Sequence, residues 1–194
     1  MLLDKKGTKL VSIIAPDKAR VCSEYLPDNF KENELKINNN YKEFLKQFDD
    51  KKIAHINFND WFLQIKDTLQ IPVFAKNGIH WTQSSAYYAL DSLQRYFEKA
   101  KGVSYAKMER TKINGYKKPW GPDVDISLTM NLLWPPNELY IPYYQAFSDS
   151  SLLDKPKVLV ISDSFWDAPS WSGYDKLLFQ QKEFIEVQAL IILI

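Results

Sequence analysis

Short apolar runs alternate with amphipathic segments in the first part of the chain. Residues 9–15 and 52–58 have the β-branched and aliphatic content of strands. Between them, residues 40–48 place aromatic and aliphatic side chains three and four positions apart, which predicts an amphipathic helix. A short helix is predicted at residues 61–67, with Asp60 as its N-cap. This succession of strand, helix, strand and helix predicts an α/β fold.

A longer amphipathic segment follows at residues 83–100, where apolar side chains recur every three or four positions. Thr82 can cap its first turn, and Gly102 can end it. Near the other end of the chain, Val158–Ile161 is a continuous apolar run, which is typical of a buried parallel strand. The apolar tail at residues 189–194 is short and is expected to be a final strand or a terminus created by truncation.

The region between this helix and the strand at residues 158–161 shows neither helical nor strand periodicity. Residues 112–142 contain five prolines, which interrupt helices and sheets. We predict that residues 103–150 form a lid-like insertion, with one short helix within residues 123–131. The whole chain, residues 1–194, is expected to be one domain with a sizeable core. Its first residues resemble the end of a helix leading into a strand, so we expect it to be a piece of a longer protein.

A candidate nucleophile follows the strand at residues 158–161. The strand is stopped by Ser162, Asp163 and Ser164, and ligands of open α/β sheets bind beyond the carboxyl ends of strands. A serine hydroxyl needs a base to remove its proton. Ser164 also has a structural alternative, because Asp-Ser pairs commonly cap a turn or helix after a strand.

Few imidazoles are available as that base, because the chain has two histidines. His55 lies inside a predicted strand, which favours a structural role. His80 lies in the loop before the helix at residues 83–100, and functional side chains concentrate in such loops. His80 is therefore the candidate base, with a capping or core role as the alternative, and Trp81 is expected to pack beside its ring.

Composition narrows the function classes. The formal net charge is +1, so no concentrated basic face for nucleic acid is expected. Cys22 is the one cysteine, which excludes an intrachain disulfide and a cysteine zinc site and favours simple packing. We expect no metal site and no cofactor, because two distant histidines lack ligand spacing. We also expect no membrane span and no signal peptide in this chain.

The order of these motifs resembles the SGNH hydrolase-like domain of the AlgX/AlgJ type, a family of bacterial polysaccharide O-acetyltransferases. The family has its histidine motif first and its serine motif last, as this chain has in His80-Trp81 and Asp163-Ser164. Further resemblances lie at residues 14–19 with 24–27, and at residues 57–62. The family implies a three-layer α/β sandwich with a mainly parallel central sheet.

Two positions depart from the family pattern. The histidine motif usually has an aspartate two residues before the histidine, where this chain has Gly78. The serine motif usually has a glycine where this chain has Ser162. Loss of a triad aspartate can cost about four orders of magnitude in rate. A backbone carbonyl or another carboxylate would have to orient His80, and the candidate carboxylates are Asp60, Asp123 and Asp125.

The resemblance implies covalent acyl transfer. His80 would deprotonate Ser164, which would attack an acetyl donor, and the backbone N–H of Ser164 would stabilise the oxyanion. Asn131 is a candidate for a second oxyanion donor. Asp163 is expected to hold the turn at Ser164 rather than to react.

Three function classes remain open at this point. The leading one is O-acetyl transfer to a polysaccharide, followed by hydrolysis of a carbohydrate acetyl ester. The third is non-catalytic glycan binding or assembly, which Gly78 favours. Trp120, Trp134, Trp166 and Trp171 are expected either to line a glycan groove or to pack in the core. The family also implies a periplasmic or cell-surface location and a membrane-bound acetyl-donor partner.

Overall fold

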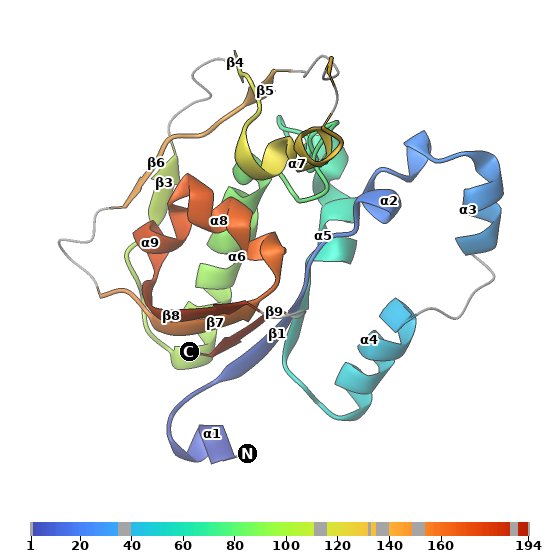
Figure 1. Cartoon of the computed structure of the whole chain (residues 1–194). Coiled ribbons are helices and arrows are strands. Elements are labelled where there is room, and N and C mark those ends of the chain that lie inside the picture. Colours follow the sequence, from blue (N-terminus) through green and yellow to red (C-terminus); the bar gives the residue numbers. More distant parts are fainter. Residues whose placement is uncertain are drawn as a thin grey trace.

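A five-stranded sheet forms the centre of the described part of the chain, with strands in the order β2-β1-β9-β7-β8 (Figure 1). The strands are β1 (Leu10–Ile14), β2 (His55–Asn57), β7 (Lys157–Ser162), β8 (Gln180–Glu186) and β9 (Leu190–Leu193). The computed structural model describes residues 2–34, 40–110, 116–131, 133–134, 140–148, 154–186 and 190–193. The fold is therefore mixed α/β, as the sequence predicts.

The sheet is mixed rather than wholly parallel. β1 pairs in parallel with β2, and β7 pairs in parallel with β8. β9 lies between β1 and β7 and is antiparallel to both. Four strands thus run in one direction, and the tail strand, which the sequence predicts without a direction, interrupts the parallel order. β1, β2 and β7 therefore present their carboxyl ends at the same edge.

Helices and short ribbons surround this sheet (Figure 1). The α-helices are α1 (Leu2–Lys5), α2 (Lys18–Val21), α3 (Asp28–Glu34), α4 (Asn40–Asp50), α5 (Phe58–Ile65), α6 (Gln83–Lys101), α7 (Asp125–Thr129), α8 (Asp167–Ser172) and α9 (Tyr174–Leu178). The 3-10 helices are η1 (Ser23–Tyr25), η2 (Lys66–Thr68), η3 (Gly121–Asp123) and η4 (Ser164–Trp166).

The core lies between the sheet and the longest helix. Val11 of β1 and Val160 of β7 are fully buried, as are Leu90 and Phe97 of α6 within 1 %. Burial of such side chains contributes roughly 1.5–3 kcal/mol each before the cost of conformational entropy. α6 shares this core with the sheet and also contacts α8 and α9, which fixes the position of the loop before α6.

The long helix begins and ends as the sequence predicts. The Thr82 side chain accepts a hydrogen bond from the backbone of Ser85, and Gly102 ends α6 with a left-handed φ of 66°. The helix α5 begins earlier than predicted. Its N-cap is Asn57, whose side chain accepts from the Asp60 backbone N–H at 3.1 Å, so the prediction of Asp60 as the cap is wrong. Asn57 is also the last residue of β2, so α5 follows the strand directly.

The segment predicted to be an insertion contains short regular elements. β3 (Met108–Arg110) pairs with β6 (Ala146–Ser148), and β4 (Tyr116–Lys117) pairs with β5 (Ile141–Pro142). Side chains of α6 reach this segment, as in the 2.6 Å hydrogen bond from Ser84 Oγ to the Pro142 carbonyl. The predicted short helix is α7. The boundaries at residues 103 and 150 stay a prediction.

Candidate active site

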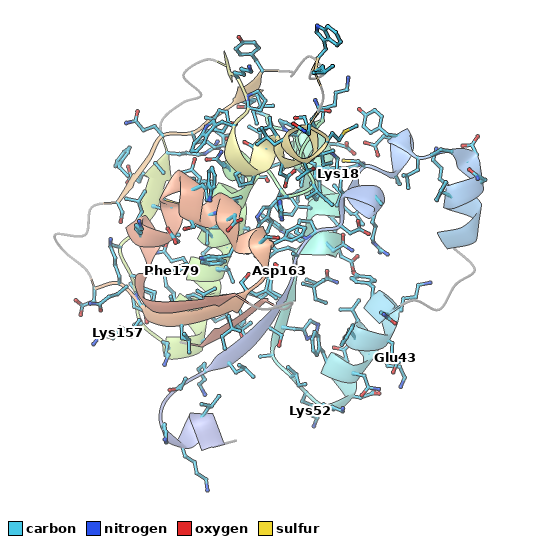
Figure 2. All side chains as sticks on the ribbon, viewed as in Figure 1. Lys18, Glu43, Lys52, Lys157, Asp163 and Phe179 are labelled. Atoms are coloured by element: carbon cyan, nitrogen blue, oxygen red, sulfur yellow. The ribbon has the colours of Figure 1, made fainter. Side chains whose placement is uncertain are left out.

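Ser164 lies at the carboxyl end of β7, where the chain turns into η4. The Asp163 carboxylate accepts a 3.0 Å hydrogen bond from the Phe165 backbone N–H and caps this short helix. The buried Ser162 hydroxyl donates to the Asp163 carbonyl at 2.9 Å. Figure 2 labels Asp163 at this end of the strand. The turn is thus held locally, while the side chain of Ser164 itself remains half-buried.

His80 is placed by its neighbours in the loop before α6. Trp81 is 1 % exposed, and its indole N–H donates to the Phe165 carbonyl at 2.7 Å. The Phe165 ring in turn packs edge-on against the His80 imidazole, with ring centroids 4.9 Å apart. The anchored Trp81 therefore joins the histidine loop to the residue that follows Ser164.

The two candidate residues are in direct contact. His80 Nε2 lies 2.8 Å from Ser164 Oγ. The other ring nitrogen, Nδ1, is hydrogen-bonded to Asp125 Oδ2. An ionised carboxylate can only accept, so Nδ1 holds the proton and Nε2 is free to accept from the serine hydroxyl. The side chains of His80 and Asp125 are 12 % and 24 % exposed, so the contact is largely shielded from water.

Asp125 is the first residue of α7 and is fixed on both carboxylate oxygens. Its Oδ1 accepts from the backbone N–H of Ile79 at 2.8 Å, next to the imidazole that binds Oδ2. The backbone N–H of Ile126 donates to the Asn77 carbonyl at 3.0 Å. The first turn of α7 is therefore hydrogen-bonded to the loop that contains His80, at Asn77 and at Ile79.

Gly78 allows this close approach. A Cβ atom at position 78 would fall 2.8 Å from the Pro122 carbonyl oxygen and 2.9 Å from the Asp123 carbonyl carbon and oxygen. All three are backbone atoms, which cannot rotate away as a flexible side chain could. At position 78, where the family's motif has an aspartate, the backbone of Pro122 and Asp123 occupies the space of the missing side chain. The same segment leads to Asp125, whose carboxylate contacts His80.

Asp123 belongs to a buried polar network with Gln83 and Tyr143. It is fully buried and accepts hydrogen bonds from the Gln83 backbone N–H at 3.2 Å and from the Tyr143 hydroxyl. Burial raises the pKa of Asp123 to about 6, although the hydrogen bonds from Tyr143 and Gln83 oppose this shift. Asp123 anchors η3 at the first turn of α6, and so holds the segment that leads to Asp125.

The three carboxylates proposed to orient His80 therefore lie in different places. Asp60 forms an ion pair with Arg20 at 3.0 Å. Asp123 bonds to Gln83 and Tyr143. Asp125 alone of the three contacts the imidazole. Sequence reasoning had no means to choose among them, because Asp125 is 45 residues from His80.

The tryptophans separate into buried and exposed groups. Trp166 is 1 % exposed and stacks on Phe179, so core packing is the alternative that its burial favours. Trp120 and Trp171 are 45 % and 54 % exposed and pack against each other with centroids 5.8 Å apart. Trp134 is 84 % exposed.

Asn131 lies just after α7, with an exposed side chain and a left-handed φ of 47°. In the described residues no hydrogen bond joins it to Ser164, so nothing in the geometry assigns it to the oxyanion. His55 has the structural setting that the sequence predicts: its Nδ1 is 3.0 Å from the Ile53 carbonyl, and its ring packs on Phe48.

Other kinds of site find little support in the described ranges. No group of three or more histidine, cysteine, aspartate or glutamate residues there is arranged to hold a metal ion. Within the same ranges, no helix combines the length and the apolarity that a membrane crossing requires. The contacts described above form a chain from the Asp125 carboxylate through the His80 imidazole to the Ser164 hydroxyl.

Comparisons with known proteins relate this chain to one family. The family model described as "SGNH hydrolase-like domain, acetyltransferase AlgX" matches residues 1–124, more than half of the chain's 194 residues. The matched region includes His80 and ends one residue before Asp125. No curated protein sequence matches the chain.

Two solved structures are similar to this fold. One is the O-acetyltransferase domain of Pseudomonas putida AlgJ, with 19 % sequence identity and a TM-score of 0.59 over 95 % of this chain. The other is Bacillus cereus PatB1, with 12 % identity and a TM-score of 0.57 over 95 % of this chain. The chain covers 64 % of the AlgJ chain and 76 % of the PatB1 chain. At these identities the likeness shows the fold.

Proposed function

Because the chain belongs to the family of SGNH hydrolase-like domains of the AlgX acetyltransferase type, we propose that it transfers acetyl groups to a polysaccharide through an acetyl–Ser164 intermediate. The observation that supports this most is the continuous contact from Asp125 through His80 to Ser164. Nucleophile, base and orienting carboxylate are the three groups that covalent acyl transfer needs.

The first half of the reaction loads the enzyme. Ser164 Oγ attacks the carbonyl carbon of an acetyl ester donor as its proton passes to His80 Nε2. The tetrahedral intermediate places its negative charge on the former carbonyl oxygen, and the Ser164 backbone N–H is the proposed donor to it. The bond to the leaving alcohol then breaks, and that alcohol takes the proton from Nε2. Asp125 stabilises the imidazolium while it exists.

The second half regenerates the serine. A sugar hydroxyl gives its proton to His80 Nε2 and attacks the acetyl carbon, and the proton then returns to Ser164 Oγ as the ester bond breaks. Water in place of the sugar would give an acetylesterase. The non-catalytic reading loses its main support, because the carboxylate missing at Gly78 has a counterpart in Asp125.

The exposed pair Trp120 and Trp171 is the proposed contact surface for the sugar, since aromatic faces pack on the apolar faces of sugar rings. Trp134 remains a second candidate. We also propose an extracytoplasmic location and a membrane-bound partner that supplies the acetyl group, on the basis of the family alone. The three-layer sandwich of the family stays a prediction.

The test is acetyl release from a chromogenic acetyl ester, followed by transfer to an oligosaccharide acceptor detected by mass spectrometry. We expect Ser164→Ala to lower the rate by about a thousandfold or more, because it removes the nucleophile. Ser170→Ala, an exposed serine of α8, is the matched control and should leave the rate unchanged. Release without transfer would identify an esterase, and equal rates in wild type and Ser164→Ala would refute the mechanism.

A further inference from the structure

Lys18 contacts the loop that contains His80, although the contacted residues are 57 to 60 positions away in the sequence. It is the first residue of α2, after the carboxyl end of β1, and Figure 2 labels it there. Its Nζ donates to the carbonyl oxygens of Ala75, Lys76 and Gly78 at 2.8, 2.9 and 2.7 Å. An ammonium has three N–H donors, so all three are used on one backbone turn.

One of these carbonyls belongs to the peptide unit between Gly78 and Ile79, and the N–H of that unit donates to Asp125. The Gly78 oxygen accepts from Lys18, and the N–H of the same peptide unit, that of Ile79, donates to Asp125 Oδ1 at 2.8 Å. A trans peptide is planar, with its C=O and N–H pointing in opposite directions. Fixing the oxygen toward Lys18 therefore aims the N–H at Asp125.

We infer that Lys18 is a positioning residue for the Asp125–His80 pair, acting through the Gly78–Ile79 peptide. The ammonium orients and polarises that peptide, and hydrogen bonds in such a chain strengthen one another. The N–H then holds Asp125 Oδ1, leaving Oδ2 aligned with His80 Nδ1. This inference rests on the proposed function for its kinetic consequence, but the alignment itself is a property of the structure.

The contacts of Lys18 differ from those of the other lysines that bind backbone. Lys66, Lys101 and Lys155 each donate to one carbonyl, those of Val21, Gly7 and Lys176 in turn. Lys18 makes no ion pair within the described residues, so carbonyl dipoles rather than a carboxylate solvate its charge. Burial lowers the pKa of Lys18, while the nearby negative charge of Asp125 opposes this shift.

Three carbonyls that converge on one point need a compact tetrahedral donor. Arginine keeps the positive charge, but its N–H groups lie in a plane and diverge. Lys18→Arg therefore keeps the positive charge but changes the directions of the N–H donors. Lys18→Met removes the charge at similar side-chain length. Lys155→Met is the matched control, because it removes a lysine-to-carbonyl bond at an exposed position away from His80.

The experiment uses proton NMR of the imidazole N–H groups together with steady-state kinetics on the acetyl ester. The chain has two histidines, so His55→Gln identifies the low-field Nδ1–H resonance of His80. We expect Lys18→Met to shift or broaden this resonance and to lower kcat by about 10- to 100-fold. KM should stay within about twofold, since substrate contacts are retained. Lys18→Arg should have neither the full wild-type kcat nor the wild-type Nδ1–H resonance.

Lys155→Met should match wild type in both measurements. A Lys18→Met protein with the wild-type resonance and wild-type kcat would overturn the inference. If circular dichroism shows that Lys18→Met is unfolded, Lys18→Arg is judged by the same two criteria. If the wild type has no ester activity, the proposed function fails, and the resonance alone still decides whether Lys18 aligns Asp125 with His80.

Discussion

Gly78 and Pro122 approach each other more closely than any side chain at position 78 would permit, because an added Cβ would lie 2.8 Å from the Pro122 carbonyl oxygen. This relationship explains how a carboxylate contacts His80 although the histidine motif lacks its aspartate. The absent side chain leaves room for η3, and η3 leads into the helix whose first residue is Asp125. Gly78 and Asp125 are thus two parts of one arrangement.

The first prediction is that restoring the family aspartate harms this protein. Gly78→Asp should lower kcat by at least tenfold and destabilise the fold by about 1–3 kcal/mol, because its Cβ forces the backbone of η3 away. Urea unfolding and ester kinetics measure the two effects. Gly78→Ala should show most of the loss, since the clash arises at Cβ. Higher activity in Gly78→Asp would show that α7 does not supply the carboxylate.

The second prediction concerns Asp125 itself. Asp125→Asn should lower kcat by about four orders of magnitude, because an amide favours the wrong imidazole tautomer and does not stabilise the imidazolium. Asp60→Asn is the matched control, since Asp60 pairs with Arg20 instead of His80. Steady-state kinetics on folded variants compare them. An Asp125→Asn enzyme as active as Asp60→Asn would remove Asp125 from the mechanism.

The third prediction is a pH dependence of stability that originates at Asp123. Burial raises the pKa of Asp123 from its ordinary value of 3.8 to about 6 in the folded chain. The folded state therefore binds more protons than the unfolded state between these values, and stability falls as pH rises through this window. The loss attributable to Asp123 is at most about 3 kcal/mol.

Asp123→Asn should remove this component, because the amide cannot ionise. The measurement is the free energy of urea unfolding at several pH values from about 4 to 7. The difference between wild type and variant isolates Asp123 from other groups that titrate in the same range. Parallel curves for the two proteins would mean that Asp123 titrates alike in the folded and unfolded chain.

The fourth prediction concerns the exposed tryptophan pair. Trp171→Ala should raise KM for a polysaccharide acceptor several-fold, because Trp171 and Trp120 offer apolar ring faces to the solvent. Hydrolysis of a small acetyl ester should be unchanged, since that substrate does not extend to the pair. Tyr25→Ala, also at an exposed aromatic residue, is the control. Equal effects on both substrates would assign Trp171 to folding or chemistry instead.

Much of the fold is determined by the sequence alone. The strand at residues 157–162 and the helix at residues 83–101 follow from apolar runs and periodicity, and Thr82 and Gly102 mark the helix ends by local backbone chemistry. Such features depend on neighbours a few positions apart, so the sequence displays them directly. The motif order of His80 and Ser164 likewise indicates the family.

Tertiary structure decided what lies around those motifs. It placed β9 antiparallel inside the sheet, covered Trp166, and brought Lys18 to the His80 loop from 57 to 60 residues away. It also selected Asp125 from three carboxylates. The physical reason is that hydrogen-bond partners are chosen by distances of about 3 Å in space, whereas the sequence records only their separation along the chain: 45 residues from His80 to Asp125 and 84 to Ser164.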